Sequence, residues 1–419
     1  MSLLEKLCDA SVWRKFYEYK TSQISSTQFS KKLDLFIKDR AYLRVYKEIA
    51  EDNAFPLPRK AVISKMSSKK KRVVYIYPEE ENTVLKLLTY LMLRKYDGIF
   101  SAGLYSFRPE RTAKDAVRRL TGIKNISGMY CYKADIHDYF NSIPVDELLP
   151  MLKDALSDDT LLYEFLYGLL SEPRVVFNGA AVTEKKGVMA GTPVSAFYAN
   201  LYLSGLDRYF EEKGAVYARY SDDIIVFSET EEEARENASF IRSYLNGKGL
   251  SLNPDKEFFS KPEDGFCFLG FEYKNGEVDI APKTMEKLKG KMYRKSRALS
   301  RWKKRNGQRG EHAARAFIRI FNRKLLEGAD DDNELTWSHW FFSVINTTKS
   351  LRVIDQYAQD CIRFLISGKR NKSRYKVKYG DMKALGYKSL VNEYYRFSNE
   401  AETSLVGEGS ALPQSSAAQ

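Results

Sequence analysis

The segment Val216-Tyr217-Ala218-Arg219-Tyr220-Ser221-Asp222-Asp223-Ile224-Ile225-Val226-Phe227 decides the fold class. Two apolar runs rich in β-branched and aromatic residues flank a polar centre, which is the pattern of two antiparallel strands joined by a tight turn. The pattern therefore predicts a β-hairpin with Asp222 and Asp223 at its tip. Two carboxylates beside buried strands are unfavourable unless cations or solvent compensate them. The choice is between a divalent-metal site at the lip of a sheet and a solvated Asp-Asp turn.

A third acid follows an apolar segment upstream. Asp135 ends the run Cys131-Tyr132-Lys133-Ala134, and Asp138 and Phe140 come shortly after it. If Asp135 ends a strand beside the hairpin, three carboxylates meet at one edge of a sheet. That arrangement suits two Mg²⁺ ions, which stabilise the attacking and leaving oxygens of an in-line phosphoryl transfer. The alternative for Asp135 and Asp138 is a helix N-cap or a turn at the end of a strand.

A glycine-rich loop lies between these acids in the sequence. The segment Gly187-Val188-Met189-Ala190-Gly191-Thr192-Pro193-Val194-Ser195 precedes a run of mostly small and apolar residues that predicts a helix. Glycines let a backbone approach closely, and the N-terminus of a helix favours phosphate. The segment is either a phosphate-binding loop or a packed joint between a loop and a helix.

The order of these segments resembles that of reverse transcriptases of the bacterial type, in the group II intron and retron superfamily. The shared pattern is Asp135 with Phe140, then Gly191 with Ser195, then the Tyr-x-Asp-Asp box. Further matches extend the resemblance over about residues 55–280: Lys65 to Arg72 before the strand Val73-Val74-Tyr75-Ile76-Tyr77, Ser106-Phe107-Arg108-Pro109-Glu110-Arg111, Leu252-Asn253-Pro254-Asp255-Lys256 and Phe268-Leu269-Gly270-Phe271.

The resemblance implies a role for each matching residue. The catalytic carboxylates Asp135, Asp222 and Asp223 would hold two metal ions, Mg²⁺ or alternatively Mn²⁺. Phe140 would be the steric gate that rejects a ribose 2′-hydroxyl. The residues implied to contact the nucleotide are Lys65, Arg72, Gly191, Ser195 and Lys256, and Arg108 is implied to contact nucleic acid. Lys65 and Arg72 would neutralise the triphosphate. Lys256 could protonate the leaving pyrophosphate.

Two positions depart from the family pattern. Ala190 stands where the family usually carries Gln, and Ala196 stands where it often carries Pro. The first change removes a polar contact near the nucleotide or the template base, which puts ordinary templating in question. It leaves the three carboxylates intact.

Positive charge is clustered in the C-terminal third. The chain of 419 residues has 68 Lys and Arg against 55 Asp and Glu, a net charge of +13 that suits a polyanionic partner. Residues 287–310 contain eleven Lys and Arg and no acid, with aromatic residues between them. We expect this segment to follow a phosphate backbone, through Arg294, Arg301, Trp302, Lys303, Lys304 and Arg305. A second basic patch covers residues 369–378, and a solvated basic face is the alternative for both.

The cysteines and the apolar runs argue against several classes of protein. Cys8, Cys131, Cys267 and Cys361 are scattered without a Cys-x-x-Cys pair, so neither a zinc site nor a disulfide framework is indicated. No apolar run is long enough to span a membrane, and no signal peptide is seen, which predicts a cytoplasmic protein without a membrane partner.

The expected fold class is α+β, a right-hand polymerase with fingers, a palm of antiparallel sheet plus helices, and an all-helical thumb. The expected divisions are a helical extension over 1–54, fingers and palm over 55–280, a basic thumb over 281–400 and a disordered tail over 401–419. The short segment after the thumb predicts no RNase H, integrase or endonuclease domain.

The expected function is RNA-directed DNA synthesis. An RNA template, expected to be a structured noncoding RNA, would be copied with dNTPs into cDNA, as in the stand-alone defence-associated reverse transcriptases that this chain resembles. The alternatives are a mobility-associated reverse transcriptase of the intron or diversity-generating type, a template-independent terminal transferase, and a non-catalytic RNA-binding scaffold. The oligomeric state is left open.

Overall fold

The structure is a computed structural model that describes residues 1–23, 27–50, 55–64, 71–184, 187–327, 337–369 and 375–408. The chain forms two compact units. The first comprises Met1–Leu269 and Lys274–Gly276, and the second comprises Gly270–Tyr273 and Glu277–Gln419.

Three helices open the first unit. After a 3-10 turn at Glu5–Cys8, they are α1 (Ala10–Gln23), α2 (Thr27–Lys38) and α3 (Tyr42–Ala50). The fully buried indole of Trp13 stacks on Tyr42 at 5.0 Å between ring centroids and donates a hydrogen bond to the Leu7 carbonyl at 2.7 Å. Phe36 of α2 packs edge-on against the same indole at 5.3 Å, so this aromatic centre ties the three helices together.

A four-stranded sheet follows, in the order β2-β1-β4-β5. Its strands are β1 (Arg59–Ser64), β2 (Lys71–Ile76), β4 (Arg174–Phe177) and β5 (Ala180–Thr183), and β1 pairs antiparallel with β2. Strand β2 contains most of the predicted strand at residues 73–77. The long helix α4 (Glu79–Lys95) begins directly after it and buries its apolar side, which includes Val84, Leu87 and Leu88.

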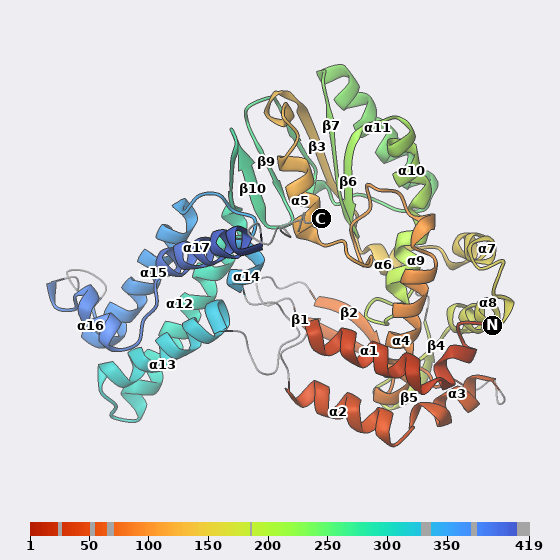
Figure 1. Ribbon diagram of the computed structural model, residues 1–419, viewed down its shortest axis with the longest axis horizontal. Helices are drawn as coiled ribbons and strands as arrows, with labels where there is room; N and C mark the ends of the chain where they lie inside the picture. The colour runs from red at the N-terminus through yellow and green to blue at the C-terminus, as the bar shows by residue number, and fades with distance from the viewer. Residues whose placement is uncertain are drawn as a thin grey trace, which may run out of the picture. The chain divides into compact units, whose positions relative to one another are not determined.

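The second four-stranded sheet contains the hairpin. Its order is β6-β7-β3-β8, with strands β6 (Val216–Tyr220), β7 (Asp223–Ser228), β3 (Tyr130–Asp135) and β8 (Phe258–Ser260), and every neighbouring pair is antiparallel. The predicted hairpin and the predicted third strand are both present. Helix α11 (Glu231–Gly247) packs against β3 and β7 (Figure 1). It begins where the hydroxyl of Thr230 accepts a hydrogen bond from the Glu233 amide.

The remaining helices of the first unit surround these sheets. They are α5 (Ala113–Thr121), α6 (Tyr139–Ser142), α7 (Val145–Ala155), α8 (Thr160–Ser171), α9 (Ser195–Tyr202) and α10 (Ser204–Glu212), with 3-10 turns at Asp97–Ile99, Ile126–Gly128 and Pro254–Lys256 and a short strand β9 (Phe266–Phe268). Helix α9 is buried along nearly its whole length, which explains why its sequence has no charged residue.

Among its described residues, the second unit is helical apart from strands β10 (Phe271–Lys274, whose last residue belongs to the first unit) and β11 (Glu277–Ile280). Its helices are α12 (Pro282–Arg305), α13 (Gly310–Asn322) continued by a π-helical turn at Arg323–Glu327, α14 (Trp337–Phe342), α15 (Lys349–Ser367), α16 (Tyr379–Ala384) and α17 (Leu390–Glu408). Helices α12, α13 and α15 pack on one another. Helix α17 runs to Glu408 and so enters the segment 401–419 that was expected to be disordered.

The α+β class is confirmed by the mainly antiparallel sheets and the helices that accompany them. In the part of the chain that the structure describes, no helix has both the length and the apolar character needed to cross a membrane.

Candidate active site

The tip of the β6–β7 hairpin is a two-residue turn. Tyr220 and Asp223 form the last strand pair, so Ser221 and Asp222 are the turn residues. Ser221 has a φ of 58°, a left-handed conformation that is uncommon outside glycine and that requires support from its surroundings. The turn places the adjacent acids at the end of the sheet, as the sequence predicts.

The three predicted acids meet at this end of the sheet. Asp135 is the last residue of β3 and lies opposite Asp223 in the antiparallel register. The next amide, that of Ile136, donates a hydrogen bond to the Asp222 carbonyl at 3.0 Å. Asp135 is only 4% exposed, so its carboxylate needs partners within the protein or a bound cation.

Burial and mutual repulsion disfavour the charged forms of the hairpin acids. Burial and the nearby carboxylate of Asp135 raise the pKa of Asp222, and Lys256 and Arg72 offset part of that effect. Burial raises the pKa of Asp223 to about 6, with Asp222 and Asp135 adding repulsion and Lys133 opposing it. Strongly perturbed acids of this kind are characteristic of functional sites.

Two lysines supply positive charge to the acids. The ammonium of Lys256 donates a hydrogen bond to Asp135 Oδ2 at 2.6 Å, and Lys133 Nζ lies 3.8 Å from Asp223 Oδ1. Lys256 reaches this position because the Asn253 amide binds the Asp135 carbonyl at 2.8 Å, which anchors the 3-10 turn Pro254–Lys256 beside β3. Sequence reasoning found Lys256, whereas Lys133 was not singled out, although it lies two residues before Asp135 in the same strand.

The donor chemistry fits divalent cations. The site offers carboxylate oxygens that repel one another, and oxygen is the donor that Mg²⁺ and Mn²⁺ prefer. Among the described residues, no group of three or more His, Cys, Asp or Glu side chains is placed so as to hold a metal ion. The ammonium of Lys256 instead provides the compensating charge at Asp135.

The glycine-rich loop joins the strand that carries Arg72 to the segment that carries Phe140. The Val188 amide donates to the Phe140 carbonyl at 2.8 Å, and the Tyr75 amide of β2 donates to the Ala190 carbonyl at 2.8 Å. Gly191 has a φ of 102°, and a Cβ there would lie 3.1 Å from the Tyr75 carbonyl oxygen. The glycine is therefore required by a close backbone approach, which the sequence indicated.

Phe140 is held from one side by Phe107. Their ring centroids lie 6.3 Å apart in an edge-to-face arrangement, and Phe107 lies 6.3 Å from Tyr220 of the hairpin. Phe107 belongs to the segment Ser106–Arg111 and has a φ of 57°. This aromatic row links the predicted gate to the strand that leads into the hairpin tip.

Three predicted site residues have other outcomes. Lys65 lies outside the described residues. The hydroxyl of Ser195 donates to the Thr192 carbonyl at 2.6 Å within its own loop and is buried, so it stabilises the loop. The guanidinium of Arg108 is buried and binds Asp97 Oδ1, Asp97 Oδ2 and the Ser101 carbonyl at 2.6–2.8 Å, which leaves no free face for the predicted phosphate contact. Arg108 is therefore a structural residue.

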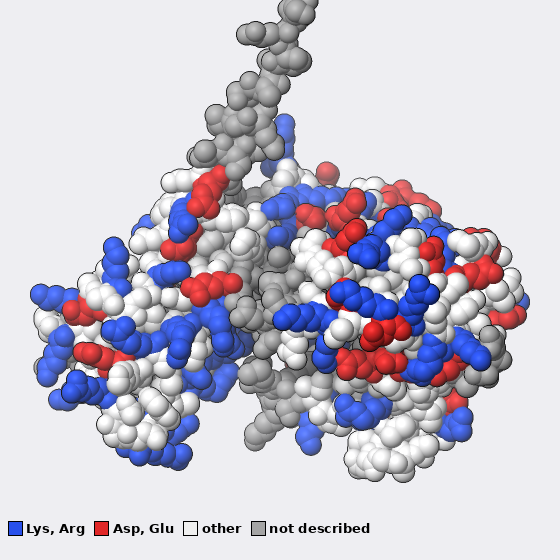
Figure 2. Space-filling model, turned by 60° about the horizontal axis from the view of Figure 1, so that its bottom comes forward, with Lys and Arg blue, Asp and Glu red and all other residues white. Residues whose placement is uncertain are grey.

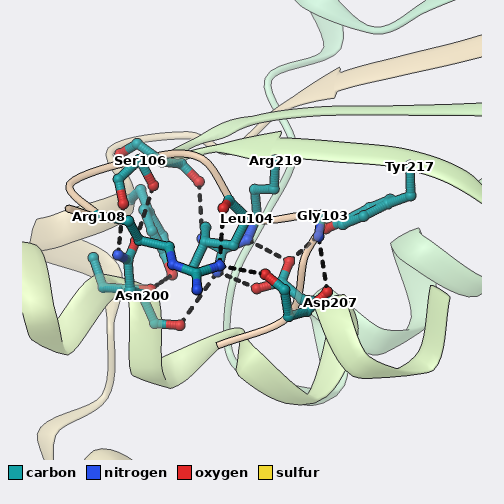
Figure 3. A network of polar contacts seen from close by, with 12 residues as sticks. Gly103, Leu104, Ser106, Arg108, Asn200, Asp207, Tyr217 and Arg219 are labelled. Atoms are coloured by element: carbon teal, nitrogen blue, oxygen red, sulfur yellow. Dashed lines mark hydrogen bonds and ion pairs between the residues drawn. The ribbon is translucent and has the colours of Figure 1, made fainter. Parts of the chain in front are cut away.

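A buried ion pair beneath the hairpin was missed by the sequence reasoning. Arg219 of β6 and Asp207 of α10 are both 0% exposed, and two guanidinium nitrogens bind the carboxylate at 2.7 and 2.6 Å (Figure 3). Burial disfavours the charge of Arg219, but the carboxylate of Asp207 holds its pKa above the usual range. The hydroxyl of Tyr217 donates to the same carboxylate at 2.7 Å. Arg219 was assigned only to an apolar strand, and the sequence has no local signal for its distant partner.

The buried pair connects the hairpin tip to two other segments. Arg219 donates to the Ser221 carbonyl in the turn and to the Asn200 carbonyl of α9, both at 3.2 Å. The side chain of Asn200 in turn exchanges hydrogen bonds with Ser106, at 2.7 and 2.9 Å (Figure 3). The strained turn is therefore supported from below by a network of satisfied polar groups.

The basic segment predicted at residues 287–310 forms most of α12. Arg294, Arg301, Trp302, Lys304 and Arg305 are exposed there, whereas Lys303 donates a hydrogen bond to the Leu365 carbonyl of α15 at 2.8 Å. In Figure 2 the Lys and Arg side chains outnumber acids on the visible face of this helical unit, at the left of the picture. Of the second patch, residues 370–374 lie outside the described residues.

Comparisons with known proteins agree with this geometry. The family model described as reverse transcriptase (RNA-dependent DNA polymerase) matches residues 63–273, which is half of the chain and includes the acids, the loop and Lys256.

Curated relatives include two proteins of Escherichia coli. Protein YkfC of strain K12 is 23% identical over 265 residues, covering 53% of this chain and 68% of that protein. The retron Ec86 reverse transcriptase is 22% identical over 173 residues, covering 40% of this chain and 50% of that protein. A putative COX1/OXI3 intron 2 protein of Saccharomyces cerevisiae is 22% identical over 237 residues, 43% of this chain and 28% of that protein.

Among solved structures, the chain is similar to telomerase from Candida tropicalis, at 12% identity and a TM-score of 0.46, over 80% of this chain and 70% of that chain.

Proposed function

The chain belongs to the reverse transcriptase family, whose members are RNA-directed DNA polymerases, and on that basis we propose that it copies a partner RNA into cDNA by two-metal-ion nucleotidyl transfer. The observation that supports this proposal best is the convergence of Asp135, Asp222 and Asp223 at one end of a sheet, with mutual repulsion that a bound cation would relieve.

Asp135, Asp222 and Asp223 would hold the metal ions, Mg²⁺ or alternatively Mn²⁺. When bound, divalent ions of this kind stabilise the charge on the attacking and leaving oxygens of phosphoryl transfer. Lys256, whose ammonium lies 2.6 Å from Asp135 Oδ2, would donate a proton to the leaving pyrophosphate. Lys133 limits the repulsion at Asp223 and so favours the ionised carboxylate that a metal requires.

Selection of the nucleotide rests on the wall formed by β2, the glycine-rich loop and Phe140. Phe140, fixed by the backbone bond to Val188 and by Phe107, would block the space that a ribose 2′-hydroxyl needs. Arg72 of β2 is exposed, and its charge lowers the pKa of Asp222, so it lies within electrostatic reach of the acids. Arg72 would bind the triphosphate, together with Lys65.

The basic helix α12 would follow the phosphate backbone of the template–product duplex. Arg294, Arg301, Lys304 and Arg305 are exposed and Trp302 is 42% exposed, so both charge and a ring face are available. Lys303 would contribute less than the other cations of α12, since its ammonium binds the Leu365 carbonyl of α15.

We further propose that the template is a structured noncoding RNA and that the cDNA serves anti-phage defence. The resemblance to stand-alone defence-associated enzymes supports this reading, and the retron relative also favours a bacterial RNA-copying enzyme. The departure at Ala190 supports a second candidate, template-independent extension, because the residue has no polar side chain to contact a template base.

Sequencing of nucleic acid that copurifies with the wild-type protein and with Asp222→Asn tests the proposal. We expect the same RNA in both preparations, and DNA complementary to that RNA only in the wild type. DNA without complementarity to any bound RNA would refute templated copying, and equal DNA in both preparations would refute catalysis by this site.

A further inference from the structure

The N-terminal helices carry a second group of cations, remote in sequence from the acids. Lys20 of α1 and Lys86 and Arg94 of α4 lie on facing sides of these two packed helices, together with Tyr19 and Tyr90. We refer to these five side chains as the α1–α4 basic face. None of the five was singled out by the sequence reasoning.

The cations of this face have aromatic partners. The guanidinium of Arg94 lies 3.6 Å from the ring centroid of Tyr90 and 4.5 Å from that of Tyr19, and the two rings are 4.7 Å apart. Lys20 Nζ lies 5.4 Å from the Tyr19 centroid. Lys86 Nζ lies 5.7 Å from the ring of Phe29 in α2.

Over the described ranges of the chain, no carboxylate forms an ion pair with Lys20, Lys86 or Arg94. Glu79 raises the pKa of Lys86, but its carboxylate forms an ion pair with Lys32 at 2.8 Å. Burial lowers the pKa of Lys20 and of Lys86, and each is further lowered by another cation of the face, Arg94 for Lys20 and Lys20 for Lys86.

Partly buried cations that repel one another destabilise the free protein. Cation–π contacts compensate only part of that cost. An anion bound at the face would remove the repulsion, so the arrangement favours an anionic ligand over a role confined to packing.

The spacing favours a polymer over a single anion. Lys86 and Arg94 are separated by eight positions in α4, which is about 12 Å along a helix axis. The charges are therefore spread over a length that exceeds one phosphate group. Arg94 is exposed and its guanidinium is held over the rings of Tyr90 and Tyr19, so this planar cation can stack on an unpaired base irrespective of sequence.

We propose that the α1–α4 basic face binds a single-stranded segment of the RNA that the enzyme copies, through its phosphates and through base stacking. The identity of that strand rests on the proposed function, while the binding itself does not.

Equilibrium binding of fluorescently labelled oligo-U RNA at a series of KCl concentrations tests the proposal. Lys20→Gln with Lys86→Gln removes two cations, and Lys15→Gln with Lys31→Gln is the charge-matched control on exposed positions of α1 and α2. We expect the log–log salt slope to fall by about 1.4 in the first variant, since each single-strand contact contributes about 0.7. We expect the wild-type slope in the control.

Lys20→Arg with Lys86→Arg keeps both charges and is expected to keep the slope. The Gln variant is expected to melt at or above the wild-type temperature, because a repulsion is removed. An unchanged slope in the folded Gln variant, or an equal fall in the control, would overturn the proposal. Incorporation of dNTPs at saturating template is expected to be normal in all three variants, so inactivity of the wild type would refute the proposed function without affecting the binding result.

Discussion

Replacing Asp207 by Asn perturbs the hairpin from below without touching the predicted metal ligands. Arg219 is 0% exposed, and two of its nitrogens bind the carboxylate that the change neutralises. The guanidinium would keep its bonds to the Ser221 and Asn200 carbonyls but would lose its counter-charge. Removal of one partner of a buried ion pair costs about 3–5 kcal/mol, because the other charge remains buried.

The free energy of unfolding, measured by urea denaturation, is therefore expected to fall by about 3–5 kcal/mol in Asp207→Asn. A double variant, Asp207→Leu with Arg219→Met, removes both charges and is expected to be more stable than the single variant. Incorporation of nucleotide is expected to be impaired in both variants, because the donor to the Ser221 carbonyl is held less firmly in the single variant and is absent from the double variant, so the strained turn is less well supported.

The comparison with the double variant separates charge burial from hairpin support. If the free energy of unfolding of Asp207→Asn lies within about 1 kcal/mol of the wild-type value, the Asp207 carboxylate is not what stabilises the buried charge of Arg219. If both variants incorporate nucleotide normally, the ion pair does not position the hairpin. Either result would refute the corresponding part of the reasoning.

Three further predictions concern the gate, the acids and the basic helix. Phe140→Ala is expected to let ribonucleotides compete with deoxynucleotides in primer extension, and unchanged discrimination would exclude Phe140 as the gate. The pKa of Asp223 is raised from 3.8 to about 6 in the fold, so the folded state binds this proton more tightly than the unfolded state. The contribution of Asp223 to the free energy of unfolding should therefore rise as the pH falls through 6 toward 3.8 and be lost above pH 6. Urea unfolding at a series of pH values should show a weaker pH dependence in Asp223→Asn than in the wild type. We expect replacement of Arg301, Lys304 and Arg305 of α12 by Gln to lower the log–log salt slope of duplex binding by about 0.9 for each phosphate that the helix no longer binds. A slope equal to that of the wild type would show that α12 does not contact the duplex.

The sequence predicted the central parts of the fold and site because their signals are local. The alternation around Asp222 and Asp223 predicts a hairpin, and β6 and β7 form it with those acids at the tip. The position of Asp135 at the end of an apolar run predicts a neighbouring strand end, and the register places Asp135 opposite Asp223.

The missed features depend on contacts between residues far apart in the sequence. Arg219 finds its partner in another element, so strand periodicity shows only where its side chain belongs and not why it is buried. Arg108 matched a family segment, yet its guanidinium is bound by Asp97 from the turn after α4. The basic run 287–310 was identified by composition, but only the packing of α12 on α15 shows that Lys303 differs from its neighbours.

Single-turnover incorporation of one dNTP on a primed RNA template, with Mg²⁺ titrated, tests the account of the three acids most directly. The wild type is expected to depend on Mg²⁺, while Asp222→Asn is expected to lose incorporation and to keep its fold, since the side chain is a proposed metal ligand at the end of a sheet and not part of the core. Glu232→Gln, an exposed acid in α11, serves as the charge-matched control and is expected to behave as the wild type. Mg²⁺-dependent incorporation by Asp222→Asn at the wild-type rate would contradict the assignment of the active site.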